Sequence, residues 1–119
     1  MTTDPSQVLD ELVEERLGRS WDLQREQGGE VRTYYVSSPS GRRIELGQSY
    51  GVHLWLVLPQ GWRVDTHADD LDSLVFEFSQ FISLAEAILR DQVRVPHPEP
   101  DSRSRRWDIP EFGIVMRTA

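Results

Sequence analysis

The chain contains no cysteine, no lysine and no asparagine, and its apolar runs are short. The absence of cysteine excludes disulfides, cysteine-ligated zinc and thiol nucleophiles. The longest apolar runs, such as LWLVL, fall far below the roughly 20 residues that a helix needs to span a bilayer. The start, MTTDPSQVLDE, has no basic segment leading into an apolar one. We therefore expect no secretory leader, no membrane association and a cytoplasmic location.

Positive charge is scarce relative to negative charge. Twenty acidic residues face thirteen basic ones, all arginine, and the formal net charge is −7 at pH 7. Because nucleic acids are polyanions, this charge argues against general nucleic-acid binding. The 38% of hydrophobic residues in 119 positions is enough to build one hydrophobic core.

The first periodic segment is helical. Asp4 fits an N-cap, Pro5 fits the first helical position, and Gly18 follows the last periodic residue. Five apolar residues recur at helical spacing between these ends: Val8, Leu9, Leu12, Val13 and Leu17. The pattern predicts an amphipathic helix with an acidic outer face.

Residues 19–67 alternate between apolar and polar instead. Five short segments, SWDLQRE, EVRTYYVS, RRIELG, VHLWLVL and WRVDTH, are separated by turns rich in glycine, proline and serine. Short alternating runs between tight turns are typical of an antiparallel meander. We expect five strands.

Residues 69–91 return to a period near 3.6, which predicts a second amphipathic helix. An alternative stays open, in which residues 74–78, LVFEF, form a sixth strand and the helix begins near Ser79. The fold class we expect is α+β, with the N-terminal helix and this C-terminal helix packed on one face of the meander.

The composition changes after Gln92. Pro96, Pro98 and Pro100 stand at alternate positions, which keeps the backbone extended and excludes a central strand. We expect residues 1–92 to form a single α+β domain and residues 93–119 to form an extended Pro/Arg-rich arm. The closing FGIVMRT could be a final strand, and whether the arm docks on its own domain stays open.

The segment GVHLWLVLPQGWRVDTH, residues 51–67, allows its strand register to be predicted. Its apolar residues share one face only if the loop has an odd number of residues, such as the three at 59–61. This parity then places Trp55 opposite Asp65 and His53 opposite His67 on the other face. His53 and Asp65 then lie diagonally across the two strands, close enough for their side chains to make contact.

His53, Asp65 and His67 could bind zinc or supply a general acid and base. Strand ends are often polar and exposed, however, and no metalloprotease, hydrolase or nucleotide-binding motif accompanies these residues. We therefore expect an exposed pair of histidines without a catalytic metal, and no cofactor.

The strand at 51–58 is apolar on both faces, which predicts a second apolar surface on the sheet. We expect Trp55, Val57, Val36 and Tyr34 to form it. Such a surface needs a cover, and the candidates are the C-terminal arm, a second copy of the chain or another protein. The arm would contribute its three large apolar residues, Trp107, Ile109 and Phe112.

These patterns favour a non-enzymatic protein-interaction module, similar to adaptors, secretion chaperones and immunity proteins in size, charge and layout only. Its partner would be another protein, or a second copy in a homodimer. The alternative is a small-ligand or metal-dependent enzyme that uses His53, Asp65 and His67.

Overall fold

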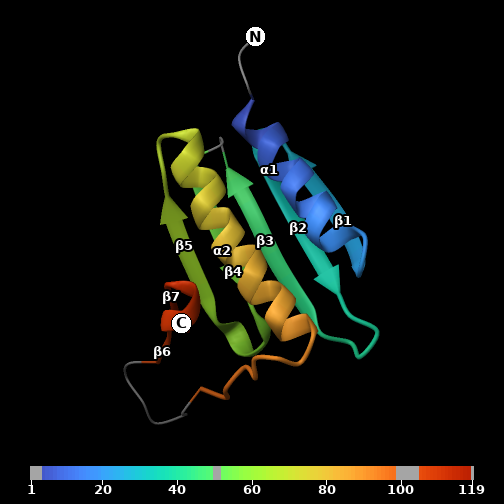
Figure 1. Ribbon diagram of the computed structural model, residues 1–119, viewed down its shortest axis with the longest axis vertical. Coiled ribbons are helices and arrows are strands. Elements are labelled where there is room, and N and C mark those ends of the chain that lie inside the picture. The colour runs from blue at the N-terminus through green and yellow to red at the C-terminus, as the bar shows by residue number, and fades with distance from the viewer. Residues whose placement is uncertain (1–3, 50–51, 99–104, 119) are drawn as a thin grey trace.

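The computed structural model describes residues 4–49, 52–98 and 105–118. They form an α+β structure with two α-helices on one face of a seven-stranded antiparallel sheet (Figure 1). The helices are α1 (Pro5–Val13), which runs on into a π-helical turn η1 (Glu14–Gly18), and α2 (Leu71–Leu89). The strands are β1 (Asp22–Gly28), β2 (Val31–Ser37), β3 (Arg43–Ser49), β4 (His53–Val57), β5 (Arg63–His67), β6 (Arg106–Ile109) and β7 (Ile114–Arg117).

Both helices begin at aspartate caps. The Asp4 carboxylate accepts a hydrogen bond from the Ser6 backbone N–H at 3.0 Å, and Pro5 occupies the first turn as expected. The Asp70 carboxylate accepts from the Ser73 backbone N–H at 2.8 Å and starts α2. Residues 74–78 lie inside α2, so the long helix is confirmed and the alternative of a sixth strand at this position is wrong.

The five expected strands are present as a meander, and each pairs with the next. The register of β4 and β5 is the one that parity predicts, with His53 opposite His67 and Trp55 opposite Asp65. The connecting loop is a single 3₁₀ turn, η2 (Pro59–Gly61). Gln60 and Gly61 both have positive φ there, at 72° and 83°.

The C-terminal segment corrects the expected fold. β6 and β7 form a hairpin around the 3₁₀ turn η3 (Pro110–Phe112), and the strand order is β1-β2-β3-β4-β5-β7-β6. The sheet therefore has seven strands, α2 is not the last element, and residues 106–117 are not an extended arm. The proline-rich residues 93–98 have no regular secondary structure, and Pro100 lies outside the described residues. Whether residues 1–92 form a folding unit by themselves stays a prediction.

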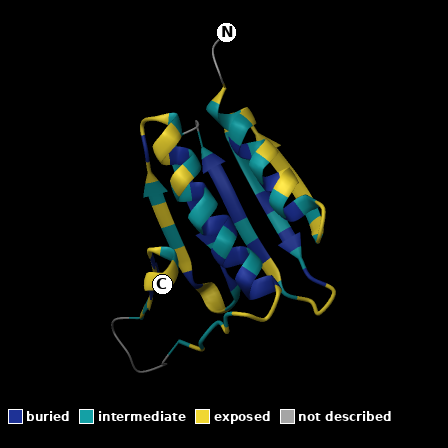
Figure 2. Ribbon diagram, viewed as in Figure 1, coloured by how far each residue is buried: buried dark blue, intermediate teal, exposed yellow. Residues whose placement is uncertain are grey.

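The core lies between the helices and one sheet face, where the buried residues gather (Figure 2). Alternate residues of the central strands point into it, because side chains of a strand alternate between faces. These include Tyr34 and Val36 of β2, Ile44 and Leu46 of β3, and Leu54 and Leu56 of β4, all with no exposed surface.

Candidate functional site

The second sheet face, here called the open face, is not covered by either helix (Figure 1). Its side chains alternate with those of the core along each strand. The residues that define it are Glu26, Tyr35, Arg43, Glu45, Gly47, His53, Trp55, Val57, Arg63, Asp65, Arg106 and Arg117. Most are polar, as is usual for an antiparallel sheet with one solvated face.

Trp55 lies at the centre of the open face, on the middle strand. Gly47 stands opposite it on β3, and a Cβ atom at position 47 would lie 1.9 Å from the Trp55 ring. The indole therefore occupies the space that a side chain would fill. Its Nε1 donates a hydrogen bond to the Glu45 carboxylate at 3.0 Å, and only 8% of the residue is exposed.

A chain of contacts runs beside Trp55. A His53 ring nitrogen lies 3.0 Å from Asp65 Oδ1, and the His53 and Trp55 ring centres are 5.6 Å apart. The Arg63 guanidinium donates to both oxygens of Asp65, at 2.8 and 2.9 Å. These hydrogen bonds, chiefly those from Arg63, hold the pKa of Asp65 below its ordinary value. The predicted diagonal contact of His53 with Asp65 is thus present.

His67 is a cross-strand neighbour of His53, as predicted, but its nearest charged partner is different. Its Nδ1 lies 3.7 Å from Asp69, while Asp65 is already held by Arg63 and His53. The described residues contain no group of three or more His, Cys, Asp or Glu side chains that could hold a metal ion. His53 and Asp65 therefore form one pair, and His67 forms a separate pair with Asp69.

Side chains of the open face also contact one another on β1, β2 and β3. The Arg43 guanidinium lies 4.5 Å from the centre of the Tyr35 ring, and the Tyr35 hydroxyl donates to Glu26 at 3.3 Å. Desolvation, together with the nearby charges of Glu26 and Glu45, raises the pKa of Tyr35. Sequence reasoning missed Tyr35.

The structure corrects the placement of Tyr34 and Val36. Tyr34 stands opposite Leu46, and Leu46 stands opposite Leu56, so this row points into the core. Tyr34 and Val36 therefore lie beneath the helices, and they do not share a face with Trp55 and Val57. In the sequence, only the alternation along paired strands could have shown this. The row that contains Trp55 runs through Gly47 and Thr33 to Glu26, and it includes neither Tyr34 nor Val36.

The three apolar residues expected in the arm, Trp107, Ile109 and Phe112, also lie on the helix-covered side. Ile109 is buried, and Trp107 and Phe112 pack against the core. The Trp107 ring meets the Trp62 ring edge-on, with ring centres 5.7 Å apart, and Trp62 Nε1 donates to the Pro96 carbonyl at 2.8 Å. Trp107 therefore does not cover Trp55, and of the three candidate covers the C-terminal arm is wrong, because the hairpin extends the sheet sideways.

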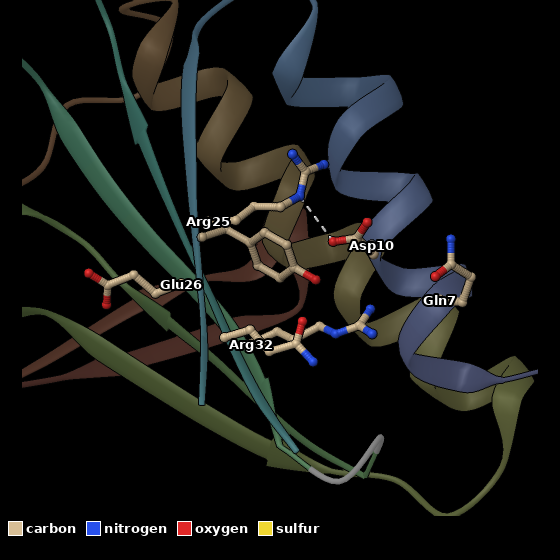
Figure 3. A pocket seen from close by; sticks show the side chains of 7 residues that line it. Gln7, Asp10, Arg25, Glu26 and Arg32 are labelled. Atoms are coloured by element: carbon tan, nitrogen blue, oxygen red, sulfur yellow. Dashed lines mark hydrogen bonds and ion pairs between the residues drawn. The ribbon is translucent and has the colours of Figure 1, made fainter. Parts of the chain in front are cut away.

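A small polar cleft separates α1 from the edge of the sheet (Figure 3). Its volume is about 180 Å³, and Gln7, Asp10, Arg25, Glu26, Gln27, Arg32 and Tyr34 line it. Arg25 binds Asp10 and Glu14, which raises the pKa of the guanidinium, while the Glu26 side chain points away from α1. Burial raises the pKa of Tyr34 to about 12. The contacts of Arg25 fasten α1 and η1 to β1.

No protein-family model, curated protein or solved structure matches this chain. Among the residues that the structure describes, neither helix is long and apolar enough to cross a membrane. The open face and its surroundings are therefore the candidate functional site.

Proposed function

We propose that this chain is a non-enzymatic protein-interaction module that binds its partner with the open face of the sheet. Val57 and Tyr35 would form the centre of contact, beside Trp55, of which 8% is exposed. The partner is another protein or a second copy of the chain, and the strongly acidic balance supports a protein in preference to a nucleic acid. A cytoplasmic location stays a prediction.

One observation carries this proposal. Both helices lie on the same side of the sheet, which leaves seven strands with a second face that bears aromatic and arginine side chains. Tryptophan, tyrosine and arginine are the residue types that most often dominate binding energy at protein interfaces. This composition supports a role in recognition.

The side chains at the centre of the open face are already ordered. Trp55 is fixed by Gly47 and Glu45, and Arg43 lies over Tyr35. A side chain that is fixed before binding loses less conformational entropy in the complex, so more of the contact energy contributes to affinity. Val57 adds a half-buried apolar surface beside Trp55.

An enzyme that works from His53, Asp65 and His67 has less support. Both oxygens of Asp65 accept hydrogen bonds from Arg63, which competes with a metal ion or a proton for them. The nearest carboxylate to His67 is that of Asp69, so the three side chains do not converge on one point.

The test is quantitative affinity capture from the native host with a tagged wild-type chain and two variants. Val57→Arg places a charge on the open face, whereas Phe76→Ser removes the large apolar side chain of α2 that is 61% exposed. We expect the proteins captured by the wild type to be retained by Phe76→Ser and lost with Val57→Arg. The proposal is wrong if Val57→Arg captures the same proteins in the same amounts.

Self-association needs its own measurement. Sedimentation velocity of the wild type and Val57→Arg distinguishes a second copy from another protein as the occupant of the open face. Dissociation of a wild-type dimer by Val57→Arg would identify the second copy. A wild-type monomer would assign the face to another protein.

A further inference from the structure

The outer edge of β5 is paired over only part of its length. In the described chain β7 pairs with β5 at one position, Arg63 opposite Arg117, and the hairpin lies beside the beginning of β5 (Figure 1). Beyond Arg63 the two strands part. The second half of β5 therefore forms an edge of the sheet.

The backbone groups on this edge can be identified from the β4–β5 ladder. The Leu58 N–H donates to the Trp62 carbonyl and the Ala68 N–H donates to the Val52 carbonyl, so even-numbered residues of β5 bond to β4. The N–H and C=O groups of Asp65 and His67 must then point outward. Neither residue has a β7 partner in the described ladder. Unpaired groups of this kind are a template for an added strand.

A hollow lies where β5 and β7 part. Its volume is about 410 Å³, and Arg63, Val64, Asp65, Val115, Arg117 and Thr118 line it. Val115 is 37% exposed and, with Phe76, is one of two large apolar side chains exposed in the described residues. The Thr118 hydroxyl oxygen is buried without a hydrogen-bond partner in the described structure. The hollow thus offers an apolar contact at Val115.

The charge beside the hollow is positive. Arg63, Arg117 and Arg106 stand opposite one another on three adjacent strands, an arrangement that destabilises a sheet through like-charge repulsion. Arg63 binds Asp65 and Arg106 binds Asp108, but Arg117 has no ion-pair partner among the described residues. An uncompensated arginine in a chain of net charge −7 favours an anionic ligand.

We propose that an extended peptide segment with acidic side chains binds in this hollow as an additional strand on the edge of β5. Its main chain pairs with the backbone of Asp65 and His67, and one of its carboxylates binds Arg117. An apolar side chain of the peptide contacts Val115. This inference rests on the proposed function, because it names the chemistry of the protein partner.

The test uses fluorescence anisotropy with a labelled hexapeptide of alternating glutamate and valine. We expect saturable binding by the wild type and binding about tenfold weaker with Arg117→Gln, since a hydrogen-bonded ion pair is lost. Arg19→Gln makes the same change of charge at an exposed position on the α1 side of the molecule and should bind like the wild type. Thermal melts of both variants check that each is folded.

Two further peptides separate strand addition from charge attraction alone. Replacement of glutamate by lysine should abolish binding, and replacement of valine by proline should abolish it too, because proline lacks the N–H that pairs with a strand. Amide hydrogen exchange at Asp65 and His67 should slow when the glutamate–valine peptide is present.

Absence of saturable binding, equal weakening by Arg117→Gln and Arg19→Gln, or undiminished binding of the proline peptide would each overturn this inference. The affinity capture with Val57→Arg is independent of these peptides. If the peptide fails while Val57→Arg still loses the captured proteins, the proposed function stands and the edge site does not. If the peptide binds while capture is unchanged, the edge site stands without the open face.

Discussion

At the scale of single residues, the centre of the open face depends on one pair, Gly47 and Trp55. The indole fills the space above Gly47 and is held there by Glu45, so an aromatic residue on a solvated sheet face is nonetheless 8% exposed. The arrangement requires a residue without a Cβ atom at position 47. Gly47 has no positive φ, so steric space and not backbone conformation selects glycine here.

Gly47→Ala should therefore displace Trp55 and reduce the free energy of unfolding by about 1–3 kcal/mol, the usual cost of overpacking. Gly28→Ala is the matched control, because nothing lies within 4 Å of a Cβ atom at position 28 of β1. Urea denaturation of both variants measures the difference. Equal stability of the two variants would contradict the close contact of Trp55 with Gly47.

The Asp65 carboxylate gives a prediction about pH. Its pKa is lowered in the folded state, chiefly by the hydrogen bonds from Arg63, so its contribution to stability is present above the unfolded pKa and is lost as the pH falls below about 4. Arg63→Gln should raise the midpoint of the Asp65 titration, measured by carboxyl ¹³C NMR. The same midpoint in the wild type and in Arg63→Gln would show that Arg63 does not determine it.

At the scale of elements, the C-terminal hairpin is fastened by contacts on its helix-covered side. Trp107 packs against Trp62, and Ile109, Ile114 and Met116 are buried in the core. The opposite side of the hairpin carries Arg106 and Arg117 on the open face. The hairpin thus joins the core with one side and supplies charge with the other.

Trp107→Ala should lower the free energy of unfolding by about 2 kcal/mol, because it removes a partly buried aromatic side chain from the core. Val115→Thr, on the open side of the same hairpin, should change stability by less than about 0.5 kcal/mol. Thermal or urea unfolding compares the two. A larger effect at Val115 than at Trp107 would mean that the sides of the hairpin have been assigned incorrectly.

The sequence predicted best the elements with a long or complete pattern. Parity across the three-residue loop was sufficient to place His53 opposite His67, and α2 had an apolar stripe over its whole length. β6 and β7 have only four residues each, too few for alternation to outweigh the prolines and arginines beside them, so only FGIVMRT, which contains β7, suggested a strand. The error at Tyr34 had another cause, since both tyrosines of TYYV fit an apolar face and only pairing with Leu46 decides between them.

At the scale of the whole molecule, the two sheet faces carry different kinds of side chain. One face, with α1 and α2, contains the core, while the open face carries fixed aromatic side chains and ion pairs. Apart from Gly47 and the buried Trp55, side chains on the open face lie outside the core, so we expect their substitution to affect folding less. This separation is what allows a binding surface to be tested by substitution.

Site-specific photo-crosslinking in the native host tests the role of the open face most directly. A benzophenone amino acid replaces Tyr35 on the open face in one variant and Phe76 on the outer side of α2 in the other, so that an aromatic residue is exchanged in each. We expect discrete crosslinked adducts from position 35 and none from position 76. Adducts from position 76 alone would contradict it and place the partner on the helices.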